Sequence, residues 1–156
     1  MGRPIADTCR AYNLGFASPD EQARLLGSFG HAGSADPGHR AAIARALAAP
    51  LVPVAEADGV LVGVRRGGHR DRPQRAVLQS LFVDGGRHRR GIGRCLVERF
   101  EKACREDGVV EIKVAATAYA VPFYQALGYR RSTGVRTMAG FEGRGLPYQP
   151  MRKTLA

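Results

Sequence analysis

The segment from Arg75 to Gly108 constrains the fold most, because its hydrophobic period changes once, at a loop that contains two glycines. Residues 75–83 (RAVLQSLFV) are nearly continuous in apolar residues, as in a central β-strand. From Ile92 apolar residues recur every three or four positions, which predicts an amphipathic helix closed by Gly108. Between them lies RHRRGIGR (87–94), where the first helical N–H groups lack intrahelical partners and the helix dipole adds positive charge. The loop is therefore expected to bind an anion.

The glycine pair Gly91 and Gly93 narrows the kinds of anion that this loop can bind. Without a Cβ, both residues let a phosphate approach the backbone closely. A P-loop needs Gly-Lys-Ser/Thr, whereas Gly93 is followed by Arg94 and Cys95. A dinucleotide fingerprint needs a glycine at position 96, where the chain has Leu96. Three alternatives remain: a polyanion such as nucleic acid, the phosphates of another small cofactor, or a solvated turn with no ligand.

Helical patterns fill the first fifty residues. A short helix is expected over 7–16, a second is opened by the capping box Ser18-Pro19-Asp20-Glu21, and a third runs from Asp36-Pro37 to Ala49. The glycine-rich residues 27–38 between the last two are expected to form a mobile loop.

Strand patterns dominate the rest of the chain. A hairpin with its turn at Asp58-Gly59 is expected before the central strand. In the helix that follows the glycine loop, Glu98–Lys102 and Glu101–Arg105 are spaced as ion pairs on the polar face. The expected strands are 51–57, 60–65, 75–83, 109–116, 129–137 and 147–155, with a short helix over 120–127. This order predicts an α/β sandwich around a mixed sheet.

The composition is that of an ordinary globular chain with an unusual charge. With 156 residues, 44% of them hydrophobic, one domain covering 1–156 is expected. Lys and Arg number 24 against 14 Asp and Glu, a net charge of +10, and arginines concentrate at 65–75 and 87–94. Such a basic surface suits nucleic acid, an acidic surface or a phosphorylated cofactor, or is simply solvated. The chain has no recognition helix and no basic stripe interleaved with aromatic residues, which disfavours nucleic acid.

Targeting and redox signals are weak. No run approaches the roughly 18 consecutive apolar residues of a membrane span, and the N-terminal MGRPIADTCR has no signal-peptide core. A cytoplasmic protein without membrane contact is therefore expected. Cys9, Cys95 and Cys104 are odd in number and lack metal-ligand spacing, so free thiols and no metal are expected.

Two further motifs carry a family resemblance. The segment LFVDGGRHRRGIGRCL followed by PFYQALGYR resembles the GNAT superfamily of acyl-CoA-dependent N-acyltransferases, and the closing PYQPMRKTL resembles its last strand. The resemblance covers about residues 51–155 and rests on Leu81, Val83, Gly91 and Gly93 in the first motif and Phe123, Tyr124, Gly128 and Tyr129 in the second. The chain departs from the family at His88, where Gln or Arg is usual, and at Thr117, where many members have Asn. The family's first strand is not evident before Asp7.

The resemblance implies an α/β (α+β) fold: a mixed, mostly antiparallel sheet with splayed central strands and helices on both faces. It also implies acetyl-CoA as co-substrate, with its pyrophosphate on the amides of residues 89–94 and its pantetheine arm along 81–83, in the splay beside 109–116. The implied cofactor-binding residues are Leu81, Phe82, Val83, His88, Arg89, Arg90, Gly91, Ile92, Gly93, Arg94, Thr117 and Tyr124.

The implied reaction is acetyl transfer to a primary amine by direct attack in a ternary complex. Tyr124 is the candidate proton donor to the thiolate, whereas Tyr119 and Tyr129 are expected to be structural. A backbone N–H near Leu81 could polarise the thioester carbonyl. The general base is open among Glu56, Glu111 and His31, acting directly or through a water held by Gln79 or Ser80, and no base is needed if the amine binds neutral.

The acceptor is not readable from the sequence. Its contacts are expected from the glycine-rich segments 16–40 and 138–147. A different class of function stays open: a nucleic-acid-binding or regulatory module on the same fold, without transfer. The final strand ends the chain and could leave an edge that pairs between two subunits.

Overall fold

The structure, a computed structural model, describes residues 2–48, 54–70, 72–138 and 145–155. A single sheet organises the chain, in the order β1-β2-β3-β4-β7-β5, with β6 also paired to β7. Within the described residues only β3 and β4 pair in parallel, which confirms a mixed, mostly antiparallel sheet. The strands are β1 (Val54–Ala57), β2 (Val60–Arg70), β3 (Arg72–Val83), β4 (Glu111–Ala116), β5 (Arg130–Arg131), β6 (Arg136–Thr137) and β7 (Pro147–Thr154).

Three expectations about strands need correction. The strands expected to end at Arg65 and begin at Arg75 continue as β2 and β3 through the basic 65–75 run, which is the far end of a long hairpin. The strand expected over 129–137 is two short pieces, because residues 130–137 have no buried side chain to hold one face against the core. The final strand is not an edge, since β7 lies between β4 and β5. Residues 51–53 of the first expected strand lie outside the described residues.

The N-terminal helices are α1 (Gly2–Tyr12), α2 (Pro19–Leu26), η1 (Gly27–His31) and α3 (Pro37–Leu47). The capping box of α2 is confirmed, with the Glu21 N–H donating to Ser18 Oγ and the Ser18 N–H donating to Glu21. Two expectations were wrong. Helix α1 begins at Gly2 rather than residue 7, because Ile5 and Ala6 are buried on its inner face, and the expected loop 27–38 contains η1, which buries Phe29.

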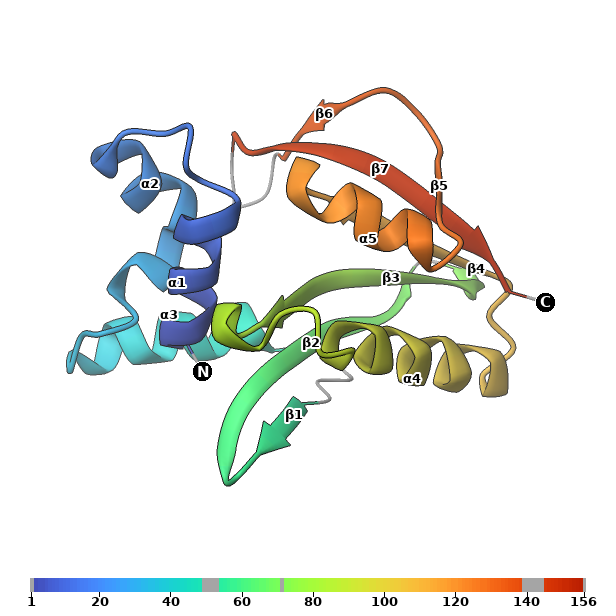
Figure 1. The fold of residues 1–156 in the computed structure, drawn as a ribbon, viewed down its shortest axis with the longest axis horizontal. Coiled ribbons are helices and arrows are strands. Elements are labelled where there is room, and N and C mark those ends of the chain that lie inside the picture. The colour runs from blue at the N-terminus through green and yellow to red at the C-terminus, as the bar shows by residue number, and fades with distance from the viewer. Residues whose placement is uncertain (1, 49–53, 71, 139–144, 156) are drawn as a thin grey trace.

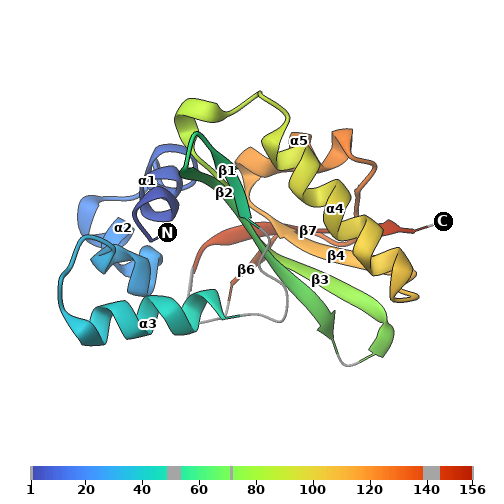
Figure 2. The same cartoon turned by 90° about the horizontal axis from the view of Figure 1, so that it is seen from below.

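The remaining helices are η2 (Gly85–Arg87), α4 (Ile92–Glu106), η3 (Ala118–Ala120) and α5 (Val121–Ala126). Adjacent residues of β3 show which helices cover which face: Leu81 packs on the core beneath α4 and α5, and Phe82 packs on the core beneath α1 and α2. Helices therefore cover both faces, as expected. Figures 1 and 2 show α1–α3 together at one end of the sheet and α4 lying along the neighbouring part.

The polar side of α4 differs from expectation. Glu101 was placed on a solvent face with Arg105, but its side chain is buried and accepts a hydrogen bond from Lys153 Nζ at 2.7 Å. Arg105 also reaches Glu101, at 3.6 Å. The expected Glu98–Lys102 pairing is replaced, since Glu98 pairs with Arg94 and Lys102 with Glu106. The helical spacing therefore predicted the position of α4 correctly, but the buried face of the helix is wider than expected and includes Glu101.

Arg65 is the largest departure from the expected basic surface. It is 1% exposed, its guanidinium lies 4.0 Å from the centre of the Phe100 ring, and its Nε and Nη1 have no hydrogen-bond partner among the described residues. Burial lowers the pKa of Arg65 to about 10. This arginine is part of the core beneath α4 rather than part of an anion-binding surface.

The centre of the sheet opens between β3 and β4. Their pairing runs from Arg75↔Glu111 to Leu78↔Val114, although β3 continues to Val83 and β4 to Ala116. Beyond Leu78 the two parallel strands separate, which confirms the expected splay. Because of this separation, the edge of β3 over residues 80–83 faces the space between the strands instead of β4.

Candidate functional site

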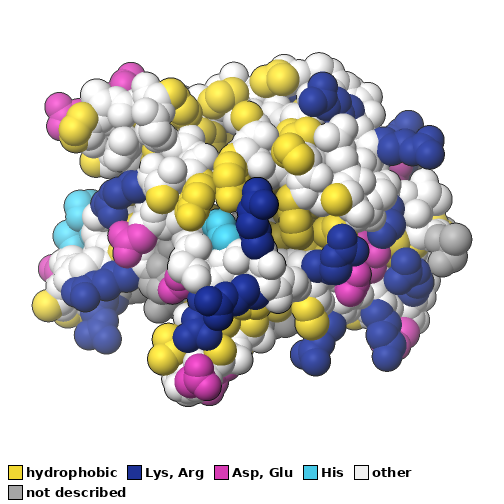
Figure 3. Space-filling model, in the orientation of Figure 1, with side chains coloured by type: hydrophobic (Ala, Val, Ile, Leu, Met, Phe, Trp, Pro, Cys, Tyr) yellow, Lys and Arg dark blue, Asp and Glu magenta, His cyan; other side chains and the backbone are white. Residues whose placement is uncertain are grey.

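A cavity of about 1080 Å³ begins where β3 and β4 separate. Its walls come from the ends of those strands, the loop before α4, the η3–α5 segment and the N-terminal helices α1 and α2. On the face shown in Figure 3, hydrophobic side chains gather between the N-terminal helices and the α4–α5 region, with Lys or Arg side chains beside them. The site therefore combines an apolar interior with a basic rim.

Most of the residues expected to bind a cofactor line this one cavity. Arg90, an exposed residue, is not among the described residues that line it. Arg87, which was not expected, does line it. The expected residues along the cavity are Leu81, Phe82, Val83, His88, Arg89, Gly91, Ile92, Gly93, Arg94, Thr117 and Tyr124.

The two glycines of the loop serve different purposes. Gly91 is the N-cap of α4 and has φ +79°, a left-handed conformation that disfavours residues with a Cβ, and the position of its absent Cβ is open space. Gly93 has an ordinary helical φ, but a Cβ there would lie 3.3 Å from the Phe123 ring. The first α-helical hydrogen bond of α4 joins the Cys95 N–H to Gly91 O at 2.9 Å. The N–H groups that precede Cys95 in the first turn therefore have no acceptor within the helix. Gly91 thus keeps this turn open toward the cavity, and Gly93 packs α4 against α5.

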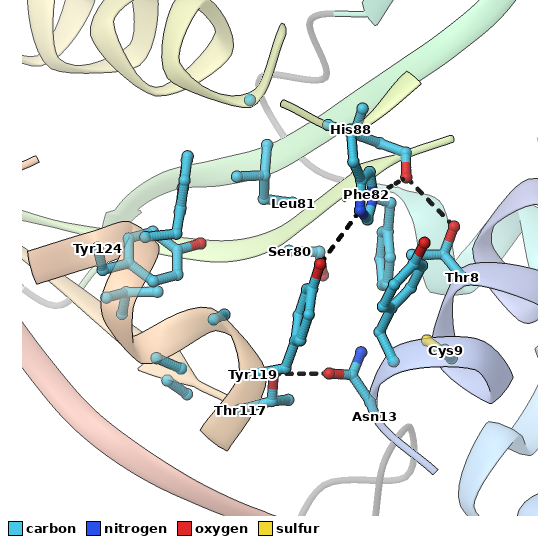
Figure 4. Close-up of a pocket in the computed structure, with 18 of the residues that line it drawn as sticks. Thr8, Cys9, Asn13, Ser80, Leu81, Phe82, His88, Thr117, Tyr119 and Tyr124 are labelled. Atoms are coloured by element: carbon cyan, nitrogen blue, oxygen red, sulfur yellow. Dashed lines mark hydrogen bonds between the residues drawn. The ribbon is translucent and has the colours of Figure 1, made fainter. Parts of the chain in front are cut away.

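Tyr124 lies on the inner face of α5, with its hydroxyl directed into the cavity (Figure 4). The residue is 4% exposed, and its ring contacts Phe123 and Tyr129 edge-on, with centroids 5.1 and 5.4 Å away. Burial raises the pKa of Tyr124 above its usual value, so the hydroxyl keeps its proton near neutral pH. Tyr124 is therefore a fixed hydrogen-bond donor within the cavity.

His88 is held by the chain itself. Its Nε2 lies 2.9 Å from Val83 O, and its Nδ1 lies 3.3 Å from the hydroxyl oxygen of Tyr119. The ring also packs against Tyr12 of α1, with centroids 4.6 Å apart. Tyr119 was expected to be structural, but it is 53% exposed and lines the cavity, whereas Tyr129 is buried as expected.

Helix α1 supplies a wall that the sequence motifs did not reveal. Thr8 Oγ1 donates to Val83 O at 3.2 Å, and Thr117 Oγ1 donates to Asn13 Oδ1 at 2.7 Å, so α1 is joined to the ends of both splayed strands (Figure 4). Both contacts span more than seventy residues, and no local pattern signals them. A helical period beginning at Ile5 was the available signal for the helix, but not for its place at the cavity.

The segments expected to contact an acceptor do reach the cavity. From 16–40 the lining residues are Leu25, Leu26 and Phe29, and from 138–147 they are Met138 and Leu146. Residues 139–144 lie outside the described residues. All five side chains are apolar, so this part of the wall is built to contact a hydrophobic group.

None of the three candidate bases is among the described residues that line the cavity. Glu111 lies at the start of β4 and forms ion pairs with Arg75, Lys113 and Arg152, at the opposite end of the strand from the splay. His31 stacks on His39 outside the cavity, and Glu56 is an exposed residue of β1. The described lining contains no carboxylate, although it does contain Gln79 and Ser80.

Cys9 is a lining thiol without nucleophilic character. Burial raises its pKa to about 11, against smaller opposing effects of Asn13 and Arg10, so the thiolate is scarce near neutral pH. The described residues hold no cluster of three or more His, Cys, Asp or Glu side chains arranged for a metal ion. Nor does the described part of the chain include a helix with the length and apolarity needed to cross a membrane.

A family model described as an acetyltransferase (GNAT) domain matches residues 36–155. Among curated proteins, YxbD of Bacillus subtilis is 41% identical over 55 residues. That alignment covers 33% of this chain and 35% of YxbD, so it spans about a third of the relative's length.

Solved structures share the fold. A GCN5-related N-acetyltransferase from Rhodopseudomonas palustris matches with a TM-score of 0.72 and 20% identity, over 99% of this chain and 87% of its own. An aminoglycoside 6′-N-acetyltransferase complexed with coenzyme A matches with a TM-score of 0.61 and 17% identity, over 99% and 91% of the two chains. An aminoglycoside 6′-acetyltransferase type Ii matches with a TM-score of 0.64 and 22% identity, over 99% and 90%.

Proposed function

Because the chain belongs to the GNAT acetyltransferase family, we propose that it transfers an acetyl group from acetyl-CoA to a primary amine within a ternary complex. The observation that carries the proposal is the separation of β3 and β4 into a cavity with the first turn of α4 on its wall. Residues 1–156 act as one domain in this proposal, since α1 completes the wall that the family motifs leave open.

The cavity fits a coenzyme A thioester in three respects. The first-turn amides of α4, with Arg87, Arg89 and Arg94 on the lining, suit the charge of a pyrophosphate. Beyond Leu78 the edge of β3 is no longer paired with β4, so an extended amide-bearing arm could lie along residues 80–82 in place of that strand. The volume, about 1080 Å³, can hold such an arm and an acceptor together.

Transfer requires that an amine lone pair attack the thioester carbonyl, forming a C–N bond while the C–S bond breaks. A main-chain N–H of β3 near Leu81 would stabilise the negative charge that develops on the carbonyl oxygen. Tyr124, protonated and directed into the cavity, would donate its hydroxyl hydrogen to the departing thiolate. The attacking nitrogen loses one proton as the amide forms, and that proton replaces the one that Tyr124 gives to the thiolate, so the products are an amide and a thiol.

The acceptor wall favours an amine carried on an apolar body. Its residues on α2, η1 and the segment before β7 are Leu25, Leu26, Phe29, Met138 and Leu146, and the described lining has no carboxylate to bind additional positive charges. A polycationic acceptor would need such carboxylates. We therefore expect a monoamine with a hydrophobic group to be a better substrate than a polyamine sugar.

Acetyl-CoA binding and turnover test the proposal in two steps. At about a hundredfold excess over Kd, a ligand that binds only the folded state adds roughly 2.7 kcal/mol to the unfolding free energy, a clear rise in Tm. Release of free thiol would then be followed with a panel containing phenylethylamine, an alanine-initiated peptide and an aminoglycoside. No thermal shift with acetyl-CoA, together with salt-dependent binding of oligonucleotides, would overturn transfer in favour of a nucleic-acid-binding module on this fold.

A further inference from the structure

A chain of hydrogen bonds crosses the cavity wall next to α1. Val83 O lies 3.2 Å from Thr8 Oγ1 and 2.9 Å from His88 Nε2, and His88 Nδ1 lies 3.3 Å from Tyr119 Oη. Figure 4 shows the chain from Thr8 through His88 to Tyr119 bordering the same space into which Tyr124 points. Tyr119 and Tyr124 thus face one cavity from different positions, and the proposed mechanism assigns no role to the first.

The partners of His88 determine where its protons lie. A carbonyl oxygen only accepts hydrogen bonds, so Nε2 must carry a hydrogen and donate to Val83 O. In the neutral ring Nδ1 is then an acceptor, and the Tyr119 hydroxyl must donate to it. This arrangement leaves the lone pairs of Tyr119 Oη available on the cavity side.

Ring contacts and side-chain hydrogen bonds hold His88 and Tyr119 in this arrangement. The Tyr12 ring lies 4.6 Å from the His88 ring and 4.8 Å from the Tyr119 ring, measured between centroids, and so contacts both partners. Two side-chain bonds, Thr8 to Val83 O and Thr117 to Asn13, join α1 to both splayed strands. The imidazole is therefore oriented by its surroundings, as a proton acceptor requires.

We propose that Tyr119 and His88 form a relay that removes the proton from the acceptor amine. This inference rests on the proposed acetyl transfer and names the base for it. The acceptor enters as an ammonium ion: as one of its N–H protons moves to Tyr119 Oη, the hydroxyl hydrogen of Tyr119 moves to His88 Nδ1, producing a neutral amine and an imidazolium. The imidazolium keeps its Nε2–H bond to Val83 O, and it returns the Nδ1 proton to solvent after the thiol and amide have formed.

Other lining groups are less suited to this task. The other titratable or charged groups on the described lining are Cys9 and Tyr12 of α1, Tyr124 of α5, and the arginines Arg87, Arg89 and Arg94. Arginine stays protonated at physiological pH and cannot accept a proton. A neutral imidazole has a ring nitrogen that can accept a proton, and no carboxylate is present on the described lining. Tyr119 is the catalytic residue that would touch the amine, and His88 acts through it.

Two substitutions test the relay in the full chain. Tyr119→Phe retains the ring that packs on Tyr12 but removes the relay hydroxyl, and His88→Gln retains a donor for Val83 O but cannot take up a proton. We expect each to lower kcat/KM about 10²-fold near neutral pH, and the double variant to lose no more than the larger single loss. The pH profile should lose its ascending limb in both variants, and the Kd of acetyl-CoA should stay within about twofold in Tyr119→Phe. His39→Gln and Tyr148→Phe, which lie outside the described lining, are the matched controls.

The outcomes separate the relay from the proposed function. Turnover by the wild type with an unchanged pH profile in both variants would overturn the relay alone, and the absence of acetyl-CoA binding and turnover in the wild type would overturn transfer itself. Nitrogen NMR of the histidine rings gives a readout that needs no acceptor. We expect the neutral His88 ring of the wild type to be the Nε2–H form, and its Nδ1 chemical shift to change in Tyr119→Phe; an Nδ1–H form would overturn the relay.

Discussion

The two hydrophobic cores of this protein are built differently. Beneath α4 and α5, fifteen described residues are buried together and three half-buried ones pack against them. Beneath α1 and α2, seven are buried and eight half-buried ones surround them. The first core supports the proposed donor side of the cavity on regular elements, and the second forms the acceptor side from short helices. The difference indicates a rigid platform for the thioester and a more adaptable wall for the amine.

The largest effect should come from emptying the first core. Phe100 of α4 is 1% exposed and its ring packs on Arg65 of β2, so Phe100→Ala should lower the unfolding free energy by about 3–5 kcal/mol. The matched change Phe29→Ala, at a site 7% exposed in the second core, should cost about 3 kcal/mol or less, because its half-buried neighbours can collapse. Urea unfolding measures both. An equal or larger loss for Phe29→Ala would erase the contrast between the cores.

The next effect tests the donor side chemically. Tyr124→Phe removes the hydroxyl that points into the cavity but keeps the ring contacts with Phe123 and Tyr129. We expect kcat to fall about 10²-fold, with the Kd of acetyl-CoA within about twofold. Steady-state thiol release and calorimetry give the two quantities. An unchanged kcat from pH 6 to 9 would remove Tyr124 from the mechanism.

Substitution of Gly91, in the loop before α4, should have a smaller effect on stability and a specific effect on acetyl-CoA binding. Gly91→Val introduces a branched side chain at φ +79°, which should cost about 1–2 kcal/mol of stability, and places it where the phosphate would approach. The variant should fold and bind acetyl-CoA at least about tenfold more weakly. Gly91→Asn separates backbone strain from steric blocking, because Asn tolerates the left-handed conformation but its side chain still obstructs the approach of the phosphate. Wild-type affinity in both variants would contradict the assignment of the pyrophosphate to this loop.

The smallest effect concerns the acceptor side. Ser18→Ala removes the hydroxyl that caps α2 and should lower the unfolding free energy by about 1 kcal/mol. Because α2 contributes Leu25 and Leu26 to the cavity, we also expect KM for the amine to rise while the Kd of acetyl-CoA is unchanged. A change in acetyl-CoA affinity instead would show that the two sides of the cavity are coupled.

Local patterns were sufficient for the donor side. The period change between residues 83 and 92 predicted β3, the glycine loop and α4, and the pattern over 120–127 predicted α5, whereas Tyr124 was singled out by the family resemblance. These features depend on neighbours in sequence, since strand and helix periods and the helix N-terminus are properties of contiguous residues. The family resemblance was confirmed, and so was the splay of β3 and β4 that it implied.

The tertiary structure alone decided which distant groups meet. Arg65 and Glu101 are charged and were therefore expected at the surface, but both are buried. Arg65 packs on Phe100 and Glu101 pairs with Lys153, and each of these partners lies on a different element of the fold. The tertiary structure also brought α1 to the ends of β3 and β4 and joined His88 to Tyr119. Sequence spacing tells which side of an element faces inward but not which element lies opposite, because contacts between distant segments follow from packing rather than from period. The sequence by itself therefore determined the fold class and the loop, while only the packed chain placed a histidine and a tyrosine together at the cavity.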